Sequence, residues 1–147
     1  MKSQLLNQDA SGEKTFALIF DTGDEVVSTL ERFAAEHALT ACRLTAIGAF
    51  ERVTLGYFDW ERKDYERIQV DEQVEVLSLI GDIALDDATP KLHAHVVLGK
   101  RGGSTVGGHL LEARVRPTLE VLLIESPAYL RRVRDPASGL ALIRIGV

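Results

Sequence analysis

The sequence predicts an α+β fold, with an antiparallel-rich mixed β-sheet and one prominent amphipathic helix. Only one segment repeats apolar residues at helical spacing. The other apolar runs are short, rich in β-branched and aromatic residues, and separated by turn-forming residues, as in hairpins. With 147 residues, 46% of them hydrophobic, the chain has enough apolar material for one core. We expect a single domain over residues 13–147 and a flexible or edge-strand arm over residues 1–12.

The helix is predicted from about residue 23 to residue 38. The segment Thr22-Gly23-Asp24-Glu25 matches a capping box, in which the first and last side chains each accept a hydrogen bond from the other residue's backbone amide. His37 falls in the last turn, where the helix dipole favours it, so we expect a structural role. The helical spacing is carried by Val26, Val27, Leu30, Phe33, Ala34 and Ala38.

Most of the remaining chain is predicted to form strands. Gly48 lies inside one such run and indicates a bulge or a point of close packing. The run Leu119–Ile124 is almost continuously apolar, which predicts a strand covered on both faces. The predicted strands cover residues 15–20, 40–50, 53–60, 65–70, 74–85, 92–99, 105–114, 119–124, 131–135 and 140–145.

The composition argues against two classes of protein. Lys and Arg number 17 against 22 Asp and Glu, a net charge of −5, whereas free-standing nucleic-acid-binding domains are usually basic. The sequence has neither an apolar run of about 18 residues nor a signal-type apolar stretch, so we expect a cytoplasmic protein with no membrane span. The single cysteine, Cys42, excludes an intramolecular disulfide, and we expect it to be a small core residue.

Three of the four histidines fall in one predicted hairpin. His93 and His95 are two residues apart on a strand, so their side chains point to the same face. His109 follows fourteen residues after His95, beyond a glycine-containing turn. The register of the hairpin therefore decides whether the third imidazole joins the first two.

Two turn lengths are open. A three-residue Arg101-Gly102-Gly103 loop pairs Lys100 with Ser104 and places His109 directly opposite the second histidine of the pair. A four-residue loop pairs Gly99 with Ser104 and turns His109 to the other face, because a slip of one residue reverses every side chain.

In the first register the three imidazoles form one patch, as they do in open zinc sites. Zinc is then the first candidate metal, because imidazole nitrogens suit it and the chain offers no thiolate pair; nickel, cobalt and iron remain alternatives. The competing interpretation is a polar hairpin face, or a buried cluster whose histidines only form hydrogen bonds.

Other side chains are candidates for the same chemistry. Glu75 and Glu120 share strand faces with leucine or isoleucine, where burial raises a carboxyl pKa and favours a general base. The alternative, which we favour, is that both reach solvent or pair with an arginine. Glu112 is a weaker candidate, and Asp82 fits either a contact to a metal-binding histidine or a turn.

Short basic runs are the best support for phosphate or nucleic-acid binding. The acidic total favours the alternative that these side chains are solvated and paired with carboxylates. The runs are Arg131, Arg132 and Arg134; Arg114 and Arg116; and Lys100 with Arg101.

Three segments together resemble the plant-and-prokaryote conserved (PPC) domain. They are Val74–Gly81, the His93-Ala94-His95 strand and Gly107-Gly108-His109-Leu110. The resemblance extends over most of the chain, from the strand at Thr15 to the strand at Leu119. It implies an antiparallel-rich sheet with one helix, a homotrimer, and a metal site at the three histidines, as in prokaryotic relatives.

The resemblance also implies a regulatory or DNA-associated role, by analogy with plant members. In those proteins an AT-hook contacts DNA and the PPC domain drives self-association. The present chain lacks the Arg-Gly-Arg-Pro core of that hook. Glu72 and Gln73 stand where plant members have Gly-Arg, so the plant partner-binding surface does not carry over directly.

We therefore expect a cytoplasmic, homotrimeric PPC-type protein that binds a divalent metal through His93, His95 and His109. DNA is a possible partner but is disfavoured by the acidic charge and the missing AT-hook. The alternative function is a metal-dependent hydrolase or lyase acting on a small anionic substrate. A third interpretation is a scaffolding trimer without a metal.

Overall fold

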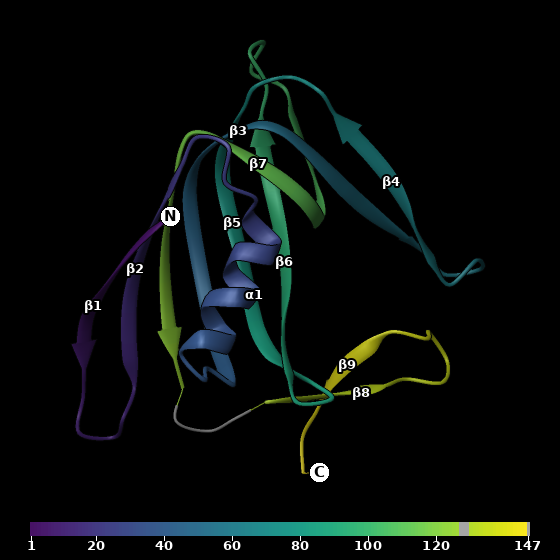
Figure 1. Ribbon diagram of the computed structural model, residues 1–147. Coiled ribbons are helices and arrows are strands. Elements are labelled where there is room, and N and C mark those ends of the chain that lie inside the picture. The colour runs from purple at the N-terminus through teal and green to yellow at the C-terminus, as the bar shows by residue number, and fades with distance from the viewer. Residues whose placement is uncertain (127–129, 147) are drawn as a thin grey trace.

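The computed structural model describes residues 1–126 and 130–146 of the chain. Figure 1 shows one helix lying against a strongly curved sheet. The elements are, in order, β1 (Lys2–Gln8), β2 (Lys14–Asp21), α1 (Val26–Glu36), β3 (Ala41–Asp59), β4 (Asp64–Val70), β5 (Val74–Asp86), β6 (Thr89–Gly99), β7 (Thr105–Glu125), β8 (Arg131–Arg134) and β9 (Ala141–Arg144).

The sheet is mixed and rich in antiparallel pairs, as predicted. Among the described strands every ladder is antiparallel except one parallel bridge between β5 and β8, at Leu85 and Arg131. The helix is only 11 residues long. The fold is therefore mostly β with a single short helix in its described part, and the predicted α+β class describes it only loosely.

Four strands close the sheet into a circuit. β3 pairs with β5, β5 with β6, β6 with β7, and β7 again with β3. β2 and then β1 extend the sheet beyond β7, while β4 extends from the second half of β3 as an arm that stands apart from the helix in Figure 1. All four strands of the circuit contribute buried side chains to one core cluster, which also includes residues of β2 and α1.

The helix covers one end of this core. Its apolar positions Val26, Leu30, Phe33 and Ala34 are buried. They belong to one cluster with buried strand residues such as Phe20, Phe50 and Leu98. Burying each large side chain of this kind contributes about 1.5–3 kcal/mol. No helix in the described part of the chain is long and apolar enough to cross a bilayer.

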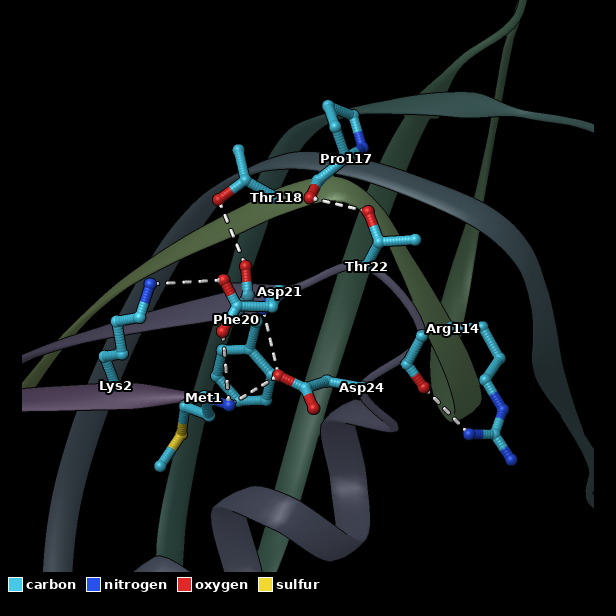
Figure 2. Close-up of polar contacts among 10 residues, drawn as sticks. Met1, Lys2, Phe20, Asp21, Thr22, Asp24, Arg114, Pro117 and Thr118 are labelled. Atoms are coloured by element: carbon cyan, nitrogen blue, oxygen red, sulfur yellow. Dashed lines mark hydrogen bonds and ion pairs between the residues drawn. The ribbon is translucent and has the colours of Figure 1, made fainter.

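The helix begins later than the sequence predicted. Thr22 is not its cap; its hydroxyl donates to the Pro117 carbonyl, 3.1 Å away, as Figure 2 shows. The backbone of Gly23 and Asp24 instead pairs with Val115 of β7, which keeps this segment extended. Helical geometry therefore starts only at Val26.

Glu25 is the observed N-cap. Its carboxylate accepts hydrogen bonds from the backbone amides of Val27 at 3.2 Å and Ser28 at 2.7 Å. The preceding carboxylate, Asp24, accepts from the Asp21 amide and pairs with the amino group of Met1 at 2.8 Å (Figure 2). The amino group of Met1 holds the pKa of Asp24 below its usual value.

Two pairs of predicted strands are single long strands, β3 and β7. Their ladder shifts where Gly48 pairs with Leu119 and Phe50 pairs with Val115, so β7 carries extra residues there. Pro117 lies in this bulge, where its missing N–H breaks no ladder bond. Gly48 has a φ of +149°, and a Cβ on it would lie 2.3 Å from the Thr118 carbonyl oxygen. The bulge predicted at Gly48 is confirmed.

The prediction that residues 119–124 are covered on both faces is wrong for the single chain. Leu119 is buried, whereas Leu122 is 52% exposed. Leu122 lies beside other exposed apolar side chains around one hollow of about 530 Å³. We call this surface the open apolar face, and it consists of Ile19, Ile47, Leu77, Ile80 and Leu122.

The cap assignment is testable. Glu25→Ala removes the acceptor of two helix amides, so we expect the free energy of unfolding to fall by about 1–2 kcal/mol. Thr22→Val is the matched control and should cost less, because it removes one exposed hydroxyl bond. Urea denaturation of both variants measures the difference. A larger loss for Thr22→Val would contradict the assignment.

Candidate metal centre

The turn between β6 and β7 adopts the register that brings the histidines together. The Lys100 amide donates to the Ser104 carbonyl at 2.9 Å, and the Gly103 amide donates to the Lys100 carbonyl at 2.8 Å. The loop therefore has three residues, and His95 pairs directly with His109. The sequence left two registers open, and the structure has the first.

The three imidazoles converge on one point. Their ring centroids lie 5.2–5.3 Å from one another, and one nitrogen from each ring lies within 4.8 Å of the other two. Nε2 of His93 is 3.3 Å from Nε2 of His95. Two imidazole nitrogens at about 2.0–2.1 Å from a tetrahedral zinc ion would stand about 3.3–3.4 Å apart. The same distance also suits a hydrogen bond between the two rings.

The lowered pKa values of two of the three histidines also suit a metal. Burial, followed by the proximity of His93 and His95, lowers the pKa of His109 from 6.5 to about 4. Burial lowers the pKa of His93 as well, although Asp82 opposes this effect. Nδ1 of His109 is buried and has no hydrogen-bond partner in the described residues. Neutral imidazoles and an unpartnered ring nitrogen are what a divalent cation requires. The residues present therefore fit a metal ion.

Asp82 lies beside the first histidine. It pairs with His93 across the β5–β6 ladder, and its Oδ2 lies 3.8 Å from Nδ1 of His93. The other carboxylate oxygen accepts a hydrogen bond from Arg132 of β8, whose side chain is only 6% exposed. A carboxylate behind a ligating histidine fixes the ring and raises its basicity. Asp82 thus contacts the cluster, and the sequence had left this role open against a turn.

Tyr65 of the β4 arm closes the cluster on the other side. Its ring stacks on His109 with centroids 4.6 Å apart and an interplanar angle of 26°. Gly56 lies opposite His109 in β3, and a Cβ there would come within 2.7 Å of the Tyr65 ring. Burial raises the pKa of Tyr65, which keeps its hydroxyl protonated at neutral pH. Sequence reasoning missed Tyr65, because nothing local relates it to the hairpin.

Comparison with known proteins identifies the family. Residues 7–127 match the family model of the Plants and Prokaryotes Conserved (PCC) domain, the PPC domain of the sequence resemblance. The chain belongs to this PPC family. Comparison with curated proteins gives no match.

Three solved structures are similar to this PPC domain over most of its length. A PPC protein from Pyrococcus horikoshii is 32% identical, with 89% of this chain and 91% of that chain covered and a TM-score of 0.84. A metal-containing protein from Archaeoglobus fulgidus is 37% identical, with 90% and 94% covered and a TM-score of 0.83. A candidate DNA-binding protein from Bacteroides thetaiotaomicron is 26% identical, with 88% and 91% covered and a TM-score of 0.85.

The remaining candidate carboxylates of the PPC domain do not reach the cluster. Glu75 is exposed and pairs with Gly99, at the end of the β5–β6 ladder opposite the turn that joins these two strands. Glu120 is exposed on the far half of β7. Glu112 is exposed and pairs with Arg67 at 2.6 Å. These positions agree with the favoured alternative of solvent contact or pairing.

The other two single candidates are structural. His37 is the C-cap of α1, and its ring lies 4.2 Å from that of Phe33. Cys42 is buried in the core, and desolvation raises the pKa of its thiol to about 12. A thiol so rarely ionised is neither a nucleophile nor a metal ligand at neutral pH.

Many basic side chains are engaged with carboxylates or carbonyls. Arg132 contacts Asp82, Lys100 pairs with Glu72 at 2.8 Å, and Arg114 donates to the Gly23 carbonyl. The sequence had assigned Arg132 to a surface basic run. The tertiary structure instead buries its side chain against Asp82, beside the same hollow that His93 and His109 line.

The depressed pKa of His109 predicts a pH effect on metal-free protein. Between pH 6.5 and about 4 the unfolded chain binds a proton at this residue and the folded chain does not. Protonation therefore favours the unfolded state, and the free energy of unfolding of the wild type falls as the pH falls. Urea denaturation of wild type and His109→Gln with chelator present, from pH 7 to 4, measures it. We expect the wild type to lose stability relative to the variant over this window. A difference independent of pH would contradict the assigned environment.

Proposed function

We propose that this protein is a self-associating PPC-domain protein that binds a divalent metal ion through His93, His95 and His109. One observation carries the proposal: the β6–β7 register brings one nitrogen from each of the three imidazoles within 4.8 Å of the other two. A polar hairpin face alone does not explain why Nδ1 of His109 is buried with no hydrogen-bond partner among the described residues. The metal-containing relative from Archaeoglobus fulgidus, which is 37% identical, supports the same conclusion.

Zinc is the metal we propose first. The three candidate ligands are all imidazoles, which suit zinc, whereas hard cations such as magnesium prefer oxygen ligands. Asp82 and Arg132 would hold His93 in place, and the Tyr65 ring would hold His109. A zinc ion with three protein ligands supplies a Lewis acid with a position open to water or to a small molecule.

The open apolar face supports the self-association. Its five members are 38–59% exposed and surround one hollow of about 530 Å³. Monomeric proteins rarely expose a contiguous apolar surface of this kind. A second copy of this chain is the occupant we propose, and the number of three follows from the family resemblance. Thr45 and Ile80 line both this hollow and the one beside His93 and His95, so the interface would border the metal site.

A DNA-associated or regulatory role is supported by resemblance and by the names of similar proteins from Bacteroides and Ralstonia. The net charge of −5 and the pairing of surface side chains such as Arg67 and Lys100 with carboxylates disfavour a nucleic-acid-binding surface. The second candidate function is a metal-dependent hydrolase or lyase. It is favoured by a hollow of about 170 Å³ next to the histidines, lined by Lys91 and Arg132.

Metal content tests the main proposal. Protein purified without a histidine tag should contain close to one zinc ion per chain by elemental analysis. His93→Ala, His95→Ala and His109→Ala should each remove it, because three ligands are needed for tight binding.

His37→Gln is the matched control, since it removes the fourth histidine, which packs against Phe33 and is not part of the cluster, and this variant should keep its metal. A wild type that holds no metal and takes up no added zinc would overturn the proposal. So would a variant series in which His37→Gln loses metal as fully as the other three.

Self-association is tested separately by mass in solution. Sedimentation of the wild type should give three times the chain mass of 16.2 kDa. Ile47→Asp places a charge on the open apolar face and should give the monomer. Ile145→Asp, at a residue 92% exposed and outside that face, is the control and should remain trimeric. A monomeric wild type, or an unchanged mass for Ile47→Asp, would reject this interface.

A further inference from the structure

A small hollow of about 170 Å³ adjoins the histidine cluster and shares no lining residue with the hollow of the open apolar face. Its walls come from segments far apart in the sequence: the β4 arm, the facing ends of β5 and β6, the start of β7, and the β8–β9 hairpin. Figure 1 shows this hairpin beside the ends of β5 and β6. The lining side chains used below are Tyr65, Lys91, Leu92, His93, Arg132 and Leu142.

The polar part of this wall is mainly cationic. Arg132 is 6% exposed, and its guanidinium donates to Asp82 and to the Ala141 carbonyl. A guanidinium has five N–H donors, so these bonds leave others for a ligand. Lys91 is half-exposed and pairs with Glu31 at 3.2 Å. Asp86 is the one acidic residue among the lining residues, against Lys91 and Arg132. A bound divalent cation would add further positive charge, so the net charge of the lining would be positive.

The rest of the wall is apolar. Leu92 contributes from β6, and Leu140, Ala141 and Leu142 contribute from the β8–β9 hairpin. The Tyr65 ring covers the side next to His109. A volume of about 170 Å³ is below the range of roughly 300–1,000 Å³ typical of sites for drug-sized ligands. The occupant must therefore be small, with a charged end and a short aliphatic end.

We propose that this hollow binds a small aliphatic carboxylate, with its carboxylate between Arg132 and the metal position and its aliphatic group against Leu92 and Leu142. The inference rests on the proposed metal site, because His93 lines both. An arginine recognises a planar carboxylate through parallel N–H bonds, which favours this group over a spherical anion. The apolar wall distinguishes a branched carboxylate from acetate or inorganic phosphate.

The experiment uses full-length protein loaded with Co²⁺, whose visible absorption reports changes at the metal. Titration with isobutyrate should change the spectrum in a saturable way, with a dissociation constant in the millimolar range. Acetate and inorganic phosphate should bind more weakly. Leu142→Trp fills the hollow but replaces none of the proposed metal-binding histidines. This variant should therefore keep its cobalt and bind isobutyrate about tenfold more weakly, or weaker still.

Ile145→Trp is the matched control, since it adds the same ring to the same hairpin outside the hollow, and its titration should equal that of the wild type. Arg132→Lys tests the cationic wall; among protein that retains cobalt, it should bind isobutyrate more weakly, because the planar fork is lost. Arg132→Lys thus probes the carboxylate end of the proposed ligand, and Leu142→Trp probes its aliphatic end.

The outcomes separate this inference from the metal proposal. Wild type that binds no cobalt or zinc overturns the metal site itself. If the visible spectrum of cobalt-loaded wild type does not change with isobutyrate up to about 100 mM, the carboxylate site alone is overturned. A site with a millimolar dissociation constant would be saturated at that concentration. Phosphate binding as tightly as isobutyrate, or Leu142→Trp binding like the wild type, also overturns it.

Discussion

The register of the β6–β7 hairpin is the constraint on which the histidine cluster depends. A three-residue turn pairs His95 with His109, and the period of two along a strand then places His93 on the same patch. A slip of one residue would send His109 to the other face of the sheet. The closed circuit of β3, β5, β6 and β7 opposes such a slip, because every strand in it is paired on both sides.

The cluster is completed by side chains that the register alone does not supply. Asp82 arrives from β5, Arg132 from the β8–β9 hairpin and Tyr65 from the β4 arm. Each fixes one neighbour: Arg132 holds Asp82, Asp82 lies behind His93, and Tyr65 covers His109. Burial keeps His109 neutral, which leaves one of its two ring nitrogens unprotonated and able to bind a cation. The proposed metal and carboxylate sites thus share His93, which belongs to the cluster and also lines the hollow.

The open apolar face gives the second organising feature. A strand that is buried on both faces can carry the same apolar sequence as a strand that is exposed on one face. Leu122 lies in such an apolar run, yet its side chain is 52% exposed in the single chain. Within the single chain its side chain faces outward, next to Ile19 and Ile47. The proposed self-association would cover these residues and would bring a neighbouring chain to the edge of the histidine cluster. Assembly and metal binding would then share a border at Thr45 and Ile80.

The sequence by itself determined the single helix, most of the strands and the three candidate histidines. These features depend on periodicity, turn chemistry and spacing, which are local properties of the chain. It misplaced the start of the helix, because the pairing of Gly23 and Asp24 with β7 is a long-range contact. It left the register open between two loops. Only the tertiary structure decided that register, buried Arg132 behind Asp82 and laid Tyr65 over Gly56 onto His109. The contacts of Arg132 with Asp82 and of Tyr65 with His109 join residues 50 and 44 positions apart, and no short-range pattern encodes which strands will lie side by side.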